Sequence, residues 1–179
     1  YSHPLDRGRG AAVWTSVKQT ASNLGPDRDS YQRMFGPLTS RFPGIVEEFL
    51  QPLVHVPGHP LALARFGAYA ALPADLLARR WRTEEARALF SGVAAHAFRP
   101  LGSVMSSAIG VALGTAAHRY GWPVAAGGSS TITTAMATRL TTDFGGRIET
   151  GVPVRDHREL GRPDLLMLNT SPVAAAEIL

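Results

Sequence analysis

The sequence contains no cysteine, and Lys18 is the only lysine among its 18 lysine and arginine residues. Without cysteine, a disulfide framework, a thiolate nucleophile and a cysteine-ligated zinc site are all excluded. The arginines are scattered, and their densest group is Arg79, Arg80 and Arg82. Because no run of basic residues resembles a nucleic-acid-binding arm, the net charge of +4 does not predict a nucleic-acid partner.

Recognisable targeting segments and long apolar runs are also missing. No charged stretch followed by an apolar one comes after Tyr1, so no signal peptide is predicted, and the lack of cysteine favours a cytoplasmic location. The 179 residues, 45% of them hydrophobic, suffice for one substantial core or two lobes. The non-methionine start and the apolar pattern of the last residues, "SPVAAAEIL", lead us to expect a fragment of a longer chain.

Apolar spacing in the first 120 residues is mostly helical. Helices are predicted over 12–24, from Asp27 or Asp29 as a cap through Phe35, and over 45–50, 59–71 and 74–81. Thr83 has the character of an N-cap, with two glutamates in the first turn of the next helix. The clearest apolar stripe follows it and consists of Ala86, Leu89, Phe90, Val93 and Ala94.

The segment 100–117 carries no charge and has a small residue at every fourth position. These residues are Gly102, Ser106, Gly110 and Gly114, the pattern of close contact between helices. A membrane-spanning helix needs about 20 apolar residues, and this segment is short and rich in serine and glycine. We therefore predict a tightly packed helix within a soluble fold, ending near His118. Peripheral association with a membrane through this helix is an open alternative.

The last third of the chain has a different character. A helix capped by Ser129 or Ser130 is predicted to end at Gly145, and Pro172 is predicted to begin another. The apolar face of the first of these two helices consists of Ile132, Ala135, Met136 and Leu140. The segments "RIETGVPV" (147–154) and "DLLMLNTSP" (164–172) have the composition of strands. The fold class expected is α+β and mostly helical, with a helical lobe over 1–120 and a partial α/β segment over 121–179.

Known catalytic motifs are not present in the glycine-rich stretches. In "GGSST", Thr131 stands where the nucleophile elbow G-x-S-x-G needs its second glycine. Neither the G-x-G-x-x-G loop nor the P-loop occurs, so the glycine pairs at 127–128 and 145–146 are interpreted as turns and caps.

Histidines supply the remaining candidates. His55 and His59 are four residues apart, but the intervening Pro57 prevents the helix that would pair them on a metal, so no metal site is predicted. His96 follows the apolar stripe and is interpreted as a hydrogen-bonded core histidine. Alternatively, it faces an apolar cavity and contacts a substrate.

A family resemblance begins in the glycine-rich region. The stretch "GWPVAAGGSSTITTAMATRLTTDFGGRIETGVPV" is similar to the interior GG-S…GG-x-I…G-x-x-V segment of phytoene dehydrogenase-related flavoproteins. These belong to the FAD-dependent amine oxidase and carotenoid desaturase superfamily. "HPLDRGRGAAVW", "RMFGPL", "HVPGHPLALARFG" and "RTEEARALFSGVAAHAF" resemble the central region of the same family, and the match covers nearly the whole chain.

The resemblance implies an FAD-dependent oxidoreductase that passes a hydride from an apolar, hydrophobic small-molecule substrate to the flavin. It implies that Val154 contacts the adenine end of FAD through its backbone, and that Thr170 and Ser171 lie near the cofactor. The helical lobe would bind the substrate, with Phe90 and His96 as candidate lining residues. The G-x-G-x-x-G loop that holds the pyrophosphate is not in this sequence and is expected upstream in the coding frame.

A different class of function fits the same helical pattern. A non-catalytic helical module that binds an apolar ligand or a partner would also be rich in alanine, leucine and glycine. A reading frame that begins near Tyr1 would favour this alternative, whereas a glycine-rich loop following a strand upstream would favour the oxidoreductase.

Overall fold

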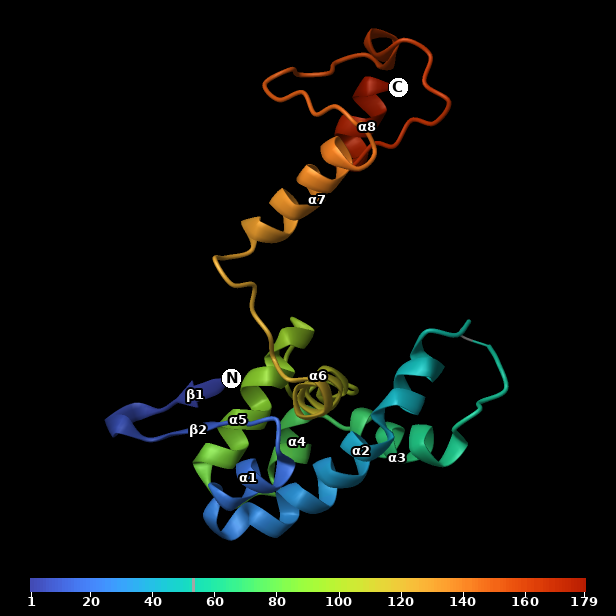
Figure 1. Cartoon of the computed structure of the whole chain (residues 1–179). Coiled ribbons are helices and arrows are strands. Elements are labelled where there is room, and N and C mark those ends of the chain that lie inside the picture. Colours follow the sequence, from blue (N-terminus) through green and yellow to red (C-terminus); the bar gives the residue numbers. More distant parts are fainter. Residues whose placement is uncertain (53) are drawn as a thin grey trace. The chain divides into compact units, whose positions relative to one another are not determined.

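The computed structural model describes residues 1–52 and 54–179 (Figure 1). The chain divides into two compact units, Tyr1–Pro123 and Val124–Leu179, close to the change of character that the sequence shows at residue 120. The fold is α+β and mostly helical, as predicted. The described residues form eight α-helices and one antiparallel sheet of two strands.

The first unit is a helical bundle with a β-hairpin at its N-terminal end. Its elements are β1 (Ser2–Pro4), β2 (Gly10–Ala12), α1 (Val17–Ser22), α2 (Arg28–Phe49), α3 (Pro60–Ala70), α4 (Ala74–Ala78), α5 (Glu84–Ala94) and α6 (Ser107–Tyr120). In the hairpin Ser2 pairs with Ala12, and both strands contact α5 (Figure 1). Helix α6 contacts α2, α3, α4 and α5, so it is the central helix of the unit.

Helix α2 is longer than the sequence predicted. Two separate helices were expected around residue 35 and over 45–50, but a single helix continues through Pro37 and Pro43. Each proline removes one backbone N–H donor and normally interrupts a helix. Here one buried stripe runs across both prolines and compensates for them by packing. The stripe consists of Tyr31, Met34, Phe35, Leu38, Phe42 and Ile45.

The predicted helix over 12–24 is shorter in the structure. Strand β2 occupies Gly10–Ala12, and α1 begins only at Val17. Ser16 is its N-cap, and its hydroxyl oxygen accepts a hydrogen bond from the backbone N–H of Gln19 at 3.2 Å. Residues 12–16 therefore belong to the hairpin and its connection to α1, and the helix predicted from the apolar spacing was about two turns too long.

Helix α6 confirms the predicted close packing for two of the four small residues. A Cβ atom on Gly110 would lie 2.9 Å from the Cβ of Ala94, and one on Gly114 would lie 2.9 Å from the ring of Phe35. The prediction was wrong for Gly102, because the helix starts only at Ser107 and Gly102 lies in the preceding turn.

A buried polar pair joins α6 to α2. The hydroxyl of Tyr31 lies 2.9 Å from Nε2 of His118, and Nδ1 of His118 lies 3.3 Å from the carbonyl oxygen of Thr15. Burial lowers the pKa of His118 below its ordinary value. A neutral ring therefore donates from Nδ1 to Thr15 and accepts from Tyr31, which satisfies both ring nitrogens.

The start of α5 is held by an acid from a distant part of the sequence. Thr83 is the N-cap, as predicted, and its hydroxyl oxygen accepts from the N–H of Ala86 at 3.3 Å. The carboxylate of the buried Asp27 accepts from the backbone N–H groups of Arg82 and Thr83 at 2.8 and 2.7 Å and from the Thr83 hydroxyl at 2.6 Å. Asp27 also occupies the N-cap position of α2, one of the two caps predicted, but its side chain makes no capping hydrogen bond to that helix.

The second unit contains α7 (Ser130–Thr142), a 3₁₀ turn (His157–Leu160) and α8 (Pro172–Ile178). Gly145 has φ of +64°, which confirms the predicted glycine after α7, and Pro172 begins α8 as predicted. Ser129 occupies the N-cap position of α7, but its side chain makes no capping hydrogen bond.

The two predicted strands of the second unit are wrong for this chain. Residues 147–154 and 164–172 form no strand in the described structure. Their backbones, over 147–155 and 162–170, make no hydrogen bond to another described residue. A strand exists only as a member of a ladder, and Val124–Leu179 supplies no neighbouring strand to complete one.

None of the helices among the described residues combines the length and the apolar character that crossing a bilayer requires.

Candidate functional site

An apolar groove in the first unit is the best candidate for a ligand site. It lies along α3 and α6 near the end of α2, with a volume of about 520 Å³. None of its lining side chains carries a charge, a hydroxyl or an amide. They are Phe49, Leu63, Phe66, Gly67, Ala70, Ala71, Met105, Ala108, Ile109 and Ala112. A concave, almost wholly apolar site of this size suits an apolar small molecule.

Residue size determines where the groove is deep. Leu63, Phe66 and Ala70 recur along one face of α3 at helical spacing, and Ala108 and Ala112 are one turn apart on α6. Glycine and alanine leave the floor open, whereas the larger side chains form the walls. Nothing lies within 4 Å of the position that a Cβ atom on Gly67 would occupy, so this floor position faces free space.

The mouth of the groove exposes large apolar side chains to solvent. The exposed fraction is 49% for Phe49, 57% for Met105 and 38% for Ile109. The rings of Phe49 and Phe66 meet edge to face with their centroids 5.0 Å apart, which fixes one wall. Covering these side chains with an apolar ligand would remove them from water and favour binding.

Polar contacts beneath the groove hold α3 and α6 in place. The hydroxyl oxygen of Ser107 lies 2.6 Å from the carbonyl oxygen of Tyr69 and 2.7 Å from that of Leu72. The N–H of Met105 donates to the carbonyl of Ala71 at 3.1 Å. Carbonyl groups at and just after the C-terminal end of α3 therefore find hydrogen-bond donors among the residues at and just before the start of α6.

The two predicted substrate-lining residues lie elsewhere. Phe90 is buried in the core, with its ring centroid 5.2 Å from that of Trp81 and its edge against Gly110. His96 is exposed, and its Nδ1 lies 3.2 Å from the carbonyl oxygen of Val93. The interpretation of His96 as a core histidine was therefore wrong, and neither residue lines the apolar groove.

The residues that the resemblance assigns to FAD lie in the second unit. Val154 is half-buried, whereas Thr170 and Ser171 are exposed. The hydroxyl oxygen of Ser171 accepts the N–H of Ala174 at 3.2 Å as the cap of α8. A tight dinucleotide site needs a glycine-rich turn between a strand and a helix to hold the pyrophosphate. No such turn joins a strand to a helix among the described residues.

The histidines near the end of α2 bind carboxylates. Nε2 of His55 lies 2.6 Å from the buried carboxylate of Glu48, which also accepts the N–H of His59 at 2.6 Å. The hydrogen bond with Glu48 raises the pKa of His55, and the same bond lowers the pKa of Glu48. Among the described residues no group of three or more acids and histidines could hold a metal ion.

Sequence reasoning missed the groove because its parts are far apart in the chain. Leu63 and Ile109 lie on different helices, and each looks like an ordinary apolar helix residue. The one signal in the sequence that could have indicated the groove is the abundance of alanine and glycine on α3 and α6 among larger apolar residues.

Comparison with protein-family models, with curated proteins and with solved structures gives no significant match to this chain.

Proposed function

We propose that this chain supplies the substrate-binding lobe, together with a segment of the cofactor domain, of an FAD-dependent oxidoreductase of the phytoene dehydrogenase type. The first unit binds the apolar substrate in the groove between α3 and α6. The observation that carries the proposal is this apolar groove, in a unit whose sequence resembles the central region of that family.

The composition of the groove supports an apolar substrate. A charged or strongly hydrogen-bonding molecule would lose its contacts with water and find no polar side chain in return. A hydrocarbon loses nothing in the same transfer and gains the contacts of Phe66, Ile109 and their neighbours. The proposed role of the lobe is to bind and orient such a molecule and to exclude water from it.

The second unit supports a role as part of a larger α/β domain. None of its residues is buried, and the apolar face of α7 is open to solvent, with exposed fractions of 57% for Ile132 and 69% for Met136. Its two strand-like segments have unpaired backbones. In a larger sheet domain, neighbouring strands would pair with these backbone groups, and the sheet would cover the apolar face of α7.

Binding of a neutral apolar probe tests the proposed site. We expect 1,6-diphenylhexatriene, a polyene that fluoresces on leaving water, to bind the 179-residue chain saturably. Gly67→Leu should weaken this binding at least about tenfold, because the new side chain extends into the open groove. Gly36→Leu is the matched control. It lies on α2, also has free space at its Cβ and lines none of the pockets described, so probe affinity should be unchanged.

Equal affinity in the wild-type and Gly67→Leu chains would contradict the assignment of the groove. Circular dichroism of both variants provides the check on folding. Because neither glycine has a positive φ and both lie within helices, neither substitution strains the backbone.

The same proposal predicts that this chain purifies without colour. The contacts offered by Val154, Thr170 and Ser171 are few, and binding must overcome about 4–15 kcal/mol of lost translational and rotational freedom. To check this expectation, the chain is incubated with FAD and desalted to remove free FAD, and the flavin absorbance of the protein is then measured. Stoichiometric flavin on the 179-residue chain would show that the cofactor site lies within it after all.

A further inference from the structure

A second pocket in the first unit has the opposite chemistry to the apolar groove. It lies between α2, α3 and the turn that follows α4 and contains Arg80, and its volume is about 630 Å³. Its lining residues are Asp29, Gln32, Arg33, Pro37, Arg65, Tyr69 and Arg80. It shares no lining residue with the apolar groove, because the two use different faces of α3.

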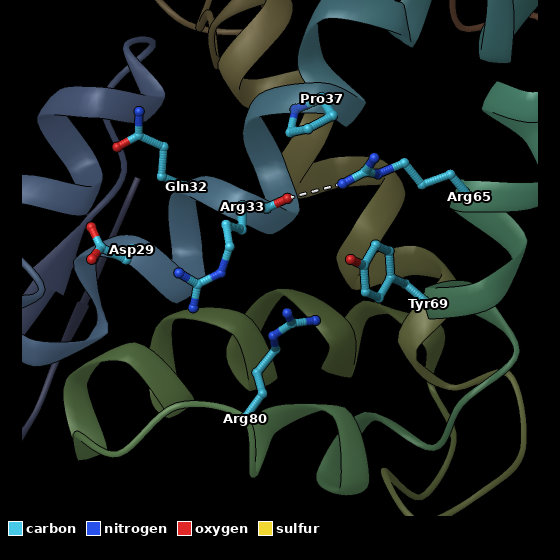
Figure 2. A pocket seen from close by; sticks show the side chains of 7 residues that line it. All are labelled: Asp29, Gln32, Arg33, Pro37, Arg65, Tyr69 and Arg80. Atoms are coloured by element: carbon cyan, nitrogen blue, oxygen red, sulfur yellow. Dashed lines mark hydrogen bonds between the residues drawn. The ribbon is translucent and has the colours of Figure 1, made fainter.

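Three arginines from three segments point into this pocket. In Figure 2 the guanidinium groups of Arg33 and Arg80 approach from opposite walls, and Arg65 reaches in from α3. Arg65 donates to the backbone carbonyl of Arg33 at 3.2 Å. Within the described part of the chain none of the three forms a salt bridge with a carboxylate.

Arg80 is held in position by weak and neutral partners. Its guanidinium lies over the ring of Tyr69 at 5.2 Å, its Nε lies 3.5 Å from the hydroxyl oxygen of Ser30, and one Nη lies 3.7 Å from the sulfur of Met34. The residue is half-buried, so water screens its charge incompletely. A fixed guanidinium with no counter-charge beside two other cations is an arrangement that an anion stabilises.

The acid at the edge of the pocket does not neutralise the cluster. Asp29 lines the pocket, but its carboxylate, like the amide of Gln32, points away from the arginines in Figure 2. One carboxylate against three guanidinium groups also leaves an excess of positive charge. A phosphoryl group carries about −1.5 to −2 charges at neutral pH and three acceptor oxygens, which matches this excess better than a carboxylate with one charge and two oxygens.

We propose that the pocket of Arg33, Arg65 and Arg80 is a binding site for a phosphoryl group. Arginine forks supply paired N–H donors to the phosphoryl oxygens, and the Tyr69 ring keeps one fork oriented. The phosphoryl group comes either from a small soluble phosphate or from the headgroup of an anionic lipid. The site is independent of the apolar groove and of the proposed oxidoreductase function.

Titration with defined anions tests the site and identifies the source. The 179-residue chain is titrated by calorimetry with inorganic phosphate and with pyrophosphate at constant ionic strength, with chloride as the reference anion. In a separate arm, phosphatidylcholine vesicles with and without phosphatidic acid are tested by flotation. Saturable binding of a soluble phosphate assigns a soluble source, and binding only to vesicles with phosphatidic acid assigns the lipid headgroup.

Charge-matched variants separate a site from general attraction. Arg33→Gln and Arg65→Gln should each weaken binding at least about tenfold, because each removes charge-assisted hydrogen bonds. Arg79→Gln removes the same charge from an exposed neighbour that does not line the pocket, and should change affinity less than about twofold. Arg33 and Arg65 are both exposed, so the two variants should still fold, and circular dichroism checks this.

Two results would overturn the proposal. One is the absence of binding in both the soluble and the vesicle arms. The other is an equal loss of affinity in Arg79→Gln and in the two pocket variants, which would reduce the effect to net charge.

Discussion

Replacing Asp27 with alanine is expected to lower the free energy of unfolding of the first unit by about 3–4 kcal/mol. The carboxylate accepts three hydrogen bonds, from the N–H groups of Arg82 and Thr83 and from the Thr83 hydroxyl, and the residue is 1% exposed. Alanine would leave buried backbone donors without an acceptor and would also loosen the cap of α5. Urea unfolding followed by circular dichroism measures the change.

The control for this variant is Asp29→Ala, two residues further along. Asp29 is exposed and makes no salt bridge among the described residues, so its loss should cost less than about 1 kcal/mol through the helix dipole alone. Equal destabilisation by the two substitutions would contradict the conclusion that the hydrogen bonds of Asp27 hold the start of α5 against the start of α2.

The ionisation of Asp27 adds a pH dependence with a definite sign. Burial alone would raise the pKa of Asp27, but the hydrogen bonds from Thr83 and Arg82 outweigh it and hold this pKa below its ordinary value. The stabilisation is therefore complete above the unfolded-state pKa of about 3.9 and is lost as the pH falls through the lower folded-state pKa. Acid unfolding of Asp27→Ala should consequently depend less on pH below about 4 than that of the wild type.

Gly110→Leu is expected to destabilise the first unit by about 3 kcal/mol, at the upper end of the range for overpacking. A Cβ atom at this position would lie 2.9 Å from the Cβ of Ala94, 3.2 Å from its Cα and 3.0 Å from the ring of Phe90. The backbone of α5 cannot move aside without disturbing the core behind it. Leucine adds three further carbons, so α5 and α6 must separate. Thermal unfolding of the variant and the wild type gives the comparison.

A control substitution that is expected to raise the stability lies on α2. Gly36 is helical and has nothing within 4 Å of its Cβ position. Gly36→Ala should therefore stabilise the protein by roughly 0.5–1 kcal/mol by removing the backbone freedom of glycine in the unfolded chain. If Gly110→Leu were as stable as the wild type while Gly36→Ala behaved as expected, the close approach of α5 and α6 would be wrong.

Features encoded by neighbouring residues were predictable from the sequence. The cap at Thr83, the stripe after it and the glycine at 145 all depend on local spacing, and the structure confirms them. The contact face of Gly110 and Gly114 followed from the same four-residue period. These features depend on backbone geometry within one or two turns, which the sequence carries directly.

Features that need distant partners were not predictable. The continuity of α2 through Pro37 depends on a core supplied by other helices, and the hairpin of β1 and β2 has strands too short to show alternation. The strand-like segments of the second unit illustrate the converse, because their composition favours strands but no described neighbour pairs with them. The two pockets, likewise, combine residues more than 30 positions apart, such as Arg33 and Arg65.

Photo-crosslinking with a neutral long-chain alkyl diazirine tests the central claim, that the first unit binds apolar molecules between α3 and α6. After illumination and peptide mapping, we expect the label on residues 63–71 and 105–112, and we expect it to decrease sharply in Gly67→Leu but not in Gly36→Leu. Label confined to the exposed apolar face of α7, or label on α3 and α6 that Gly67→Leu leaves unchanged, would contradict it.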